Sequence, residues 1–317
     1  MPTPFDPAEI PALRQSHYNA TLVDLRFCHD DLAFFRILPD HPVGPWKPGQ
    51  FCTIGLGGWE PRAPNTQPES LDDVHCRLLI RRAYSISAPI LTPTGAVAPP
   101  YLDPVLEFYI TLVRRNHGPP PALTPRLFSL QPGDRLHLAE KIAGHYTLAP
   151  MASTDTVLFF ATGTGEAPHN AMTAELLARG HTGPIVSAVC VRNQIDLGYL
   201  ETHRELERRF PNYHYLVATT RDPINLDPSV SGYVGKMYLQ DLVRQGVVES
   251  AIGHPLEPST SHAYLCGNPQ MIGIPETSHG EPPRFPQSLG MVELLSQRGF
   301  TLGDRHTAGN IHFEKYW

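Results

Sequence analysis

The sequence predicts two domains, an antiparallel β-barrel or sandwich over residues 1–150 and an α/β domain with a parallel sheet over residues 151–317. Three observations support this prediction. The chain has 317 residues, enough to bury two cores at the usual ~100–200 residues per domain. Short β-rich runs separated by turn residues occupy the first half, and most of the 34 prolines lie there too. In the second half, apolar strands alternate with segments of helical periodicity.

The first half contains six β-rich runs. They are ATLVDLRFC (20–28), LAFFRILP (32–39), QFCTIGLG (50–57), RLLIRRAYSIS (77–87), VLEFYITLVRR (105–115) and DRLHLAE (134–140). Strands of this length, with turns between them, are typical of antiparallel barrels. Two connections, 58–74 and 90–104, are rich in Pro, Asn, Ser and Gly, and we expect them to be surface loops inserted into the barrel.

The second half repeats a strand-then-helix pattern four times. The strands are VLFFAT, IVSAVCV, HYLVATT and AYLCG, and the helical segments that follow them are APHNAMTAELLARG, YLETHRELERRF, GKMYLQDLVRQG and SLGMVELLSQRG. Such a repeat predicts a parallel sheet with right-handed crossovers. The stretch 273–287 interrupts the last unit, and we expect another exposed loop there.

Charge and cysteine usage exclude several classes of function. The formal net charge of −6 gives no basic footprint for a nucleic-acid backbone, so nucleic acid is not an expected partner. No apolar run reaches the ~18 residues of a spanning helix, and the first residues lack a signal-peptide pattern, so we expect a cytoplasmic protein without a membrane partner. The 5 cysteines are widely spaced and the 16 histidines are scattered, which predicts neither a disulfide framework nor a metal site.

A glycine-rich turn lies where the first strand of the second half meets its helix. Gly163, Thr164 and Gly165 follow VLFFAT, and Pro168 is suited to the first helical turn. A turn of this kind leaves a helix N-terminus free to bind a pyrophosphate, although an ordinary glycine-rich turn has the same sequence features. Because Pro168 stands where a Rossmann fingerprint has its third glycine, a standard dehydrogenase is disfavoured.

Three cations follow the next strands of the predicted parallel sheet. IVSAVCV ends in Arg192 and not in the acidic residue that holds the ribose of NAD. Arg221 follows the third strand, and Lys236 lies at the start of the next predicted helix. Arginine and lysine are the residues that recognise a 2′-phosphate, so the set favours NADP over NAD. Solvated cations at strand ends are the alternative interpretation.

Five motifs occur in the order seen in ferredoxin/flavodoxin-NADP reductases, and the chain resembles the bacterial, FAD-containing type. The motifs are Arg82-Ala83-Tyr84-Ser85, Leu123-Thr124-Pro125-Arg126-Leu127, Gly163-Thr164-Gly165-Glu166-Ala167-Pro168, Cys266-Gly267-Asn268-Pro269-Gln270-Met271 and the terminal Glu314-Lys315-Tyr316-Trp317. The resemblance covers nearly the whole chain from about Thr21, apart from the proline-rich insertions. It implies that the barrel binds FAD and that the α/β domain binds NADP.

The resemblance also implies roles for individual residues. Arg82 would bind the FAD pyrophosphate, Tyr84 would pack along the flavin, and Ser85 would hydrogen-bond near flavin N5. Thr124 would contact the FAD phosphates. The remaining implied contacts are Cys266 against the nicotinamide, Trp317 over the flavin face, Glu314 near the active site, and Ala83, Gly267, Asn268 and Met271 as parts of the cofactor-binding motifs. Glu166 departs from the family, which usually has an apolar residue there, and is expected to place a carboxylate close to the dinucleotide. His145 and His169 lie in or beside these motifs and are expected to be solvated, with tuning of cofactor contacts as the alternative.

The implied function is electron transfer between NADPH and ferredoxin or flavodoxin, by hydride transfer to FAD N5 followed by single-electron steps. Alternatives are an NAD(P)H:flavin reductase, the reductase component of an oxygenase, or a flavin-binding docking or regulatory module without turnover. Because such carriers are acidic, docking would need a local basic patch, for which we expect Lys47, Arg114, Arg115 and Arg126.

Overall fold

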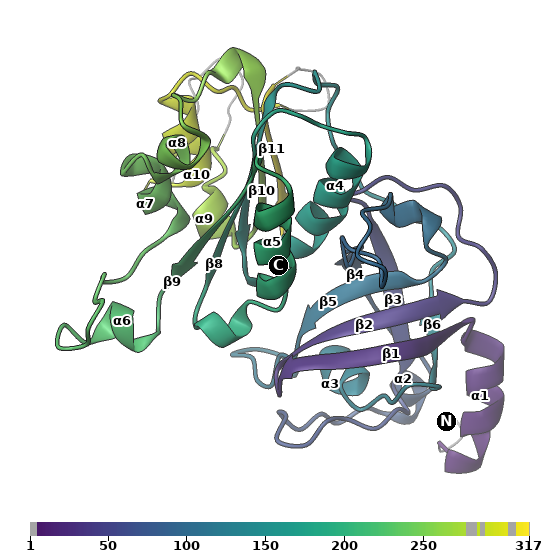
Figure 1. Ribbon diagram of the computed structural model, residues 1–317. Coiled ribbons are helices and arrows are strands. Elements are labelled where there is room, and N and C mark those ends of the chain that lie inside the picture. Colours follow the sequence, from purple (N-terminus) through teal and green to yellow (C-terminus); the bar gives the residue numbers. More distant parts are fainter. Residues whose placement is uncertain (1–4, 277–283, 286–288, 304–308, 317) are drawn as a thin grey trace. The chain divides into compact units, whose positions relative to one another are not determined.

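The computed structural model describes residues 5–276, 284–285, 289–303 and 309–316. The chain divides into two compact units (Figure 1), Met1–Ala88 with Pro100–Thr147, and Pro89–Pro99 with Leu148–Trp317. The predicted fold class is confirmed, because the first unit is built on an antiparallel sheet and the second on a parallel one.

Six strands form the sheet of the first unit. They are β1 (Ala20–His29), β2 (Leu32–Pro39), β3 (Phe51–Gly57), β4 (Leu79–Ser85), β5 (Leu106–Thr111) and β6 (Arg135–Leu138), in the order β4-β3-β6-β1-β2-β5. Ser87, just beyond β4, forms an antiparallel bridge to Glu107 of β5. This bridge joins the two ends of the sheet and closes it into a barrel. Alternate residues of β2, β3 and β5, such as Ile37, Ile54 and Phe108, point into its core.

Short helices lie around this barrel. They are α1 (Ile10–His17), α2 (Asp73–Cys76) and α3 (Thr124–Leu127). Asp72 caps α2 by accepting hydrogen bonds from the backbone N–H groups of Val74 and His75. The α3 helix begins at Thr124 and carries Pro125 in its first turn, where the missing N–H costs no hydrogen bond.

Five parallel strands form the sheet of the second unit. They are β7 (Thr156–Thr162), β8 (Ile185–Val191), β9 (Tyr213–Thr219), β10 (Ser261–Gly267) and β11 (Ile311–Lys315), in the order β11-β10-β7-β8-β9. From β7 the chain moves outward to β8 and β9, and then returns to place β10 on the other side of β7. The point where the order reverses therefore lies between β7 and β10, which is where open α/β sheets bind ligands.

Helices cover both faces of this sheet (Figure 1). On one face, α4 (Glu166–Ala178) packs on Phe159 of β7 and α5 (Leu200–Arg209) packs on Tyr215 of β9 through histidine rings. The opposite face forms a hydrophobic core with α7 (Leu239–Arg244), α8 (Val247–Ile252) and α10 (Met291–Ser296). Two shorter helices, α6 (Pro223–Leu226) and α9 (Pro269–Ile272), follow β9 and β10.

The three predicted insertions differ in their structure. Segment 58–74 is not a solvated loop, because it contains the buried Glu60 and the largely buried ion pair of Arg62 with Glu69. Segment 90–104 includes a bridge between Leu91 and Val97, and its first ten residues cluster with the second unit. Most of 273–287 lies outside the described residues.

Candidate functional site

The glycine-rich turn connects β7 to α4. Residues Gly163–Gly165 form a 3₁₀ turn, and α4 starts directly after it at Glu166, with Pro168 in the first helical turn. A side chain at Gly165 would collide with β10, because its Cβ would lie 2.7 Å from the carbonyl carbon of Cys266. Gly163 has a φ of +53°, which favours glycine, and open space lies beside it. Only glycine at 165 allows the turn to approach β10 this closely.

Backbone contacts join this turn to the end of β10. The Asn268 N–H donates to Thr162 Oγ1 at 2.7 Å, and the Asn268 side chain caps α9 by accepting from the Gln270 N–H. Gly267 and Asn268 therefore lie beside the turn at the point where the strand order reverses. Met271, in contrast, is 7% exposed and packs in the hydrophobic core.

The three predicted phosphate-binding cations follow the carboxyl ends of β8 and β9. The Arg221 N–H donates to the Arg192 carbonyl at 2.7 Å, so the two backbones lie side by side. Lys236 precedes Met237, whose N–H is 3.4 Å from the carbonyl of Thr219 at the end of β9. All three side chains are exposed, and within the described residues none of them forms an ion pair. Their charges are thus available to an anionic ligand.

Two details of this region differ from the sequence analysis. The predicted helix at 235–246 begins only at Leu239, so Lys236 lies in the preceding connection and not at a helix start. Tyr238 was missed: it is 49% exposed and lies two residues from Lys236. An exposed aromatic ring beside a phosphate-binding cation is suited to stacking on a nucleotide base, which is the signal that could have identified it.

Cys266 and Glu314 lie side by side on neighbouring strands. They are partners in the register of β10 with β11, and Tyr316 hydrogen-bonds to the Cys266 side chain. Cys266 is fully buried. Burial raises the pKa of its thiol well above the usual value, and the negative charge of Glu314 raises it further. The thiol is therefore neutral at physiological pH. Trp317 lies outside the described residues.

The first unit presents the Arg82–Ser85 motif on β4, which pairs with β3 on one side. Arg82 is exposed and donates to the neighbouring Arg81 carbonyl, and Ala83 is also exposed. Tyr84 is half-buried, and this desolvation raises the pKa of its phenol. Ser85, at the end of the strand, is buried. Polarity thus changes along the motif from an exposed cation to a buried hydroxyl.

Thr124 lies at the start of α3 in the same unit. Its Oγ1 accepts a hydrogen bond from the Val113 N–H at 3.1 Å, so the hydroxyl hydrogen remains available as a donor. The structure does not bring Thr124 into hydrogen-bond contact with the Arg82–Ser85 motif among the described residues.

A separate pocket of about 430 Å³ lies in the first unit. Its lining residues are Pro45, Trp46, Lys47, Gln50, Gly144, His145 and Thr147. His145 is exposed there, as expected. His169 is not solvated, because it is fully buried on α4 with its ring stacked on Phe159. Burial lowers the pKa of His169 to about 3, so this residue is neutral in the folded protein.

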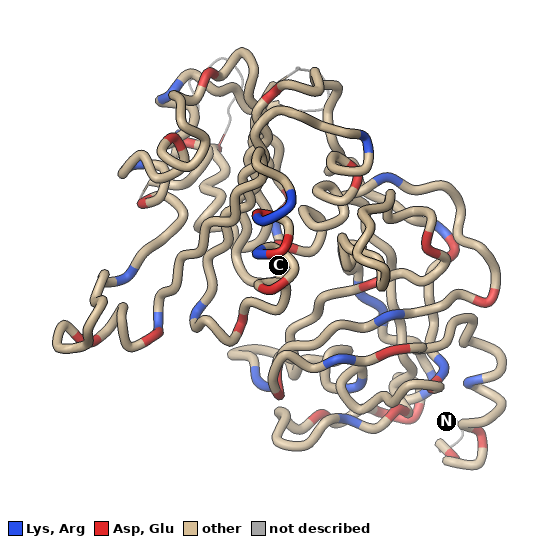
Figure 2. The backbone as a smooth tube through the Cα atoms, viewed as in Figure 1, with Lys and Arg blue, Asp and Glu red and all other residues tan. Residues whose placement is uncertain are grey.

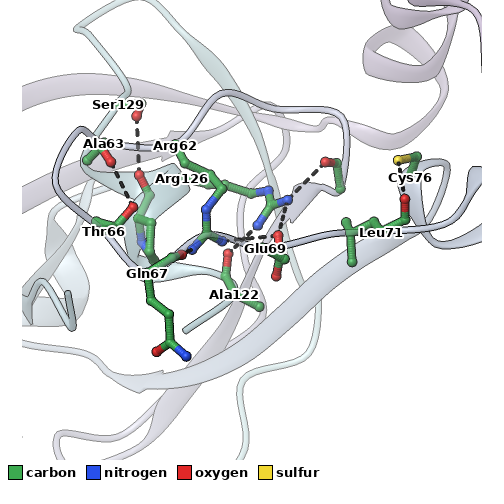
Figure 3. A network of polar contacts seen from close by, with 12 residues as sticks. Arg62, Ala63, Thr66, Gln67, Glu69, Leu71, Cys76, Ala122, Arg126 and Ser129 are labelled. Atoms are coloured by element: carbon green, nitrogen blue, oxygen red, sulfur yellow. Dashed lines mark hydrogen bonds and ion pairs between the residues drawn. The ribbon is translucent and has the colours of Figure 1, made fainter. Parts of the chain in front are cut away.

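The expected basic docking patch is wrong in two of its four residues. Arg126 is 2% exposed and belongs to a network inside the first unit (Figure 3). Its guanidinium pairs with Glu69 at 2.6 Å and donates to the carbonyls of Ala122 and Gly58. Arg114 is neutralised by Asp31 at 2.6 Å. Basic and acidic residues are interspersed over this unit (Figure 2).

Glu166 also differs from the expectation. Its carboxylate is 1% exposed and points away from solvent toward His203 and Tyr215, each with a polar atom 2.9 Å from Oε1. The acidic group is therefore held inside the α/β unit and does not line an open surface of the turn.

Comparisons with known proteins agree with this architecture. Residues 159–276 match the model of the oxidoreductase NAD-binding domain family. A flavodoxin/ferredoxin-NADP reductase of Shigella flexneri is 29% identical over 241 residues, which is 76% of this chain and 81% of that protein. One from Buchnera aphidicola is 27% identical over 284 residues, 89% of this chain and 93% of the relative. Over most of its length the chain is thus similar to flavodoxin/ferredoxin-NADP reductases.

A solved structure shows the same fold. The ferredoxin NADP+ reductase of Neisseria gonorrhoeae with bound FAD and NADP superposes with a TM-score of 0.68 at 18% identity, covering 94% of this chain and 97% of that one. No helix in the described part of the chain is both long and apolar enough to cross a membrane. Within the same residues, no group of three or more His, Cys, Asp or Glu is arranged to hold a metal ion.

Proposed function

We propose that this oxidoreductase is an FAD enzyme that transfers electrons between NADPH and a small one-electron carrier, a ferredoxin or a flavodoxin. The observation that carries the proposal is a pyrophosphate-type turn at the reversal of strand order, together with three exposed cations that follow β8 and β9 and form no ion pair within the described residues. The carrier is proposed because the relatives named above are flavodoxin/ferredoxin reductases.

The second unit fits the two charged parts of NADP. The turn Gly163–Gly165 and the first turn of α4 offer backbone N–H groups to a pyrophosphate, and glycine leaves room for its approach. Arg192, Arg221 and Lys236 lie along the neighbouring strand ends and supply positive charge for a 2′-phosphate. Tyr238 is exposed two residues from Lys236 and can stack on the adenine. An NAD site would instead carry an acidic residue after β8.

The first unit fits the polarity of FAD. Arg82 has an exposed guanidinium for the pyrophosphate, Tyr84 has a half-buried ring for stacking, and the buried Ser85 hydroxyl can hydrogen-bond to a ring nitrogen. Thr124 offers a further hydroxyl donor for a phosphate. Bound FAD would supply the chemistry, since it accepts a hydride and releases electrons one at a time.

The protein's contribution to the reaction is positioning. Hydride transfer needs the two reacting rings held in a near-attack arrangement with water excluded, and it needs no strong acid or base. Cys266 provides a neutral, compact thiol for contact with the nicotinamide, because Glu314 and burial keep it protonated. Tyr316 hydrogen-bonds to the thiol, and its backbone N–H donates to the Gly267 carbonyl at 3.0 Å.

The double variant Arg221→Ala, Lys236→Ala tests the NADP assignment. Each substitution removes a charge-assisted contact, so we expect the Kd for NADPH to rise roughly 100-fold while the Kd for NADH changes less than about threefold. Lys141→Ala removes an exposed lysine from the other unit and is the matched control. An equal loss for both nucleotides, or no loss, would contradict the assignment and favour an NAD(P)H:flavin reductase.

A further inference from the structure

Glu166 is a buried acid at the first position of the helix that follows the pyrophosphate turn. Its carboxylate is 1% exposed. The Tyr215 hydroxyl donates to Glu166 Oε1 at 2.9 Å, and Nε2 of His203 lies 2.9 Å from the same oxygen. Negative charge at a helix N-terminus is favourable, but burying it without partners would be costly. Tyr215 and His203 offset the cost of burying this carboxylate.

His203 connects Glu166 to the neighbouring strand. It is fully buried on α5, and its Nδ1 lies 2.7 Å from the Tyr213 hydroxyl on β9. Its ring stacks on that of Tyr215 with the centroids 4.0 Å apart. Nε2 of His203 thus lies at ion-pair distance from Glu166, and Nδ1 shares a hydrogen bond with the Tyr213 hydroxyl, so each ring nitrogen faces a polar group. A continuous polar chain therefore runs from the start of α4 through α5 to β9.

This chain holds one side of the pyrophosphate turn. Neither the 3₁₀ turn Gly163–Gly165 nor α4 has a side-chain hydrogen bond at its N-terminal cap. On one side, Gly165 lies against the backbone of Cys266 at the end of β10. On the other side, the side chain of Glu166 reaches His203 and Tyr215. The turn is thus fixed between β10 and the α5–β9 pair, and β9 leads directly to Arg221.

A buried acid–base pair is not the simplest way to fill this space. Apolar residues of similar volume commonly replace such pairs without loss of stability, whereas a paired charge specifies one geometry. All the groups in the chain belong to the second unit, and Ser187 hydrogen-bonds to Tyr213 at its far end. The network therefore defines the position of Glu166 more narrowly than packing alone would.

We propose that His203 is a positioning residue for dinucleotide binding, acting through Glu166 to hold the pyrophosphate turn in its binding position without contacting the ligand. This inference rests on the proposed NADP site. The Glu166–His203 pair should therefore affect the affinity for the pyrophosphate part of the ligand and not the recognition of its 2′-phosphate.

Two matched pairs of variants test the proposal in the FAD-loaded enzyme. His203→Gln keeps a donor at the position of Nε2, whereas His203→Asn is too short to reach Glu166. Glu166→Gln keeps the acceptor oxygen, whereas Glu166→Leu removes it. The probes are NADP+, which spans the turn and the cations, and adenosine 2′-monophosphate, which reaches only the cations. Calorimetric titration gives the Kd of each.

We expect His203→Asn and Glu166→Leu to weaken NADP+ about tenfold, because a displaced turn loses alignment with the pyrophosphate. Adenosine 2′-monophosphate should change less than about twofold, and the two Gln variants should stay within about threefold of wild type for both probes. A merely structural role would weaken both probes together and would not be rescued by Gln.

Three results would overturn the inference: wild-type NADP+ affinity in His203→Asn, equal loss of both probes, or no rescue by Gln. If a variant does not fold, Tyr215→Phe replaces it. That change removes only the hydroxyl donated to Glu166, and we expect NADP+ binding to weaken about threefold, with wild-type affinity contradicting the proposal. Failure of the wild type to bind NADP+ would instead refute the proposed function itself.

Discussion

Replacing Gly165 by alanine places a methyl group where the backbone of β10 already lies. The added Cβ would be 2.7 Å from the carbonyl carbon of Cys266 and 3.1 Å from the Gly267 Cα. Carbon atoms in contact normally lie about 3.5–4.0 Å apart, so the turn must move away from β10 by roughly 1 Å. Because both neighbours are backbone atoms, no side chain can rotate to make room.

A displacement of this size should be visible in the reaction with NADPH. Misplacing a reactant by about 1 Å costs on the order of 100-fold in rate, so we expect Gly165→Ala to reduce the rate constant of flavin reduction by about that factor. The assay is anaerobic stopped-flow absorbance of the FAD-loaded enzyme. Gly180→Asn, beyond the far end of α4, is the control, since Asn tolerates a positive φ and the space beside Gly180 is open. Its rate should stay within about threefold of wild type. A wild-type rate in Gly165→Ala would show that the reaction does not depend on this close approach of the turn to β10.

Two further predictions concern stability. Glu69→Gln should lower the free energy of unfolding by about 3 kcal/mol, because it leaves the buried Arg126 charge unpaired. Asp103→Asn, in the half-exposed pair with Arg36, is the control and should lower it by less than about 1 kcal/mol. Urea unfolding measures both changes, and equal losses of stability would contradict the prediction for Glu69. His169, with a pKa of about 3 when folded and an ordinary value near 6.5 when unfolded, takes up a proton on unfolding between these pH values, so stability falls as the pH falls from 7 to 5. His169→Gln should reduce that fall in the free energy of unfolding by about 2 kcal/mol, and an unchanged pH dependence would show that the histidine is not held neutral.

The sequence predicted the fold class because local periodicity determines it. Each of the six β-rich runs of the first half overlaps one strand of the barrel, and the four strand-helix repeats overlap β7 to β10 with α4, α5, α7 and α10. The strand β11 was missed, since IHFEK has a half-buried pattern with little apolar character. The helix α8 was missed too, because only Gln245 and Gly246 separate it from α7.

The environments of single charged residues could not be predicted in this way. Arg126 resembles a surface cation in the sequence, but its partner Glu69 lies 57 positions earlier in a segment that was expected to be a solvated loop. Glu166 and His169 similarly take their surroundings from other elements of the sheet and helices. Composition and spacing report which residues alternate along one element, whereas partners across elements are fixed by the tertiary packing.

The sequence could predict those residues of the candidate site that directly follow the ends of strands. The turn Gly163–Gly165, Arg192 and Arg221 follow neighbouring parallel strands, so the sheet brings them to one edge. Tyr238 required the structure, because only its 49% exposure separates it from a core tyrosine. The roles of Ser85, Thr124, Glu314 and Trp317 remain predictions.

The visible spectrum of the purified protein under anaerobic conditions, before and after addition of NADPH or NADH, tests the central claim most directly. We expect a flavin spectrum that NADPH bleaches much faster than NADH, because Arg192, Arg221 and Lys236 favour the 2′-phosphate. A colourless protein that cannot be reconstituted with FAD, or one bleached equally by both nucleotides, would contradict it.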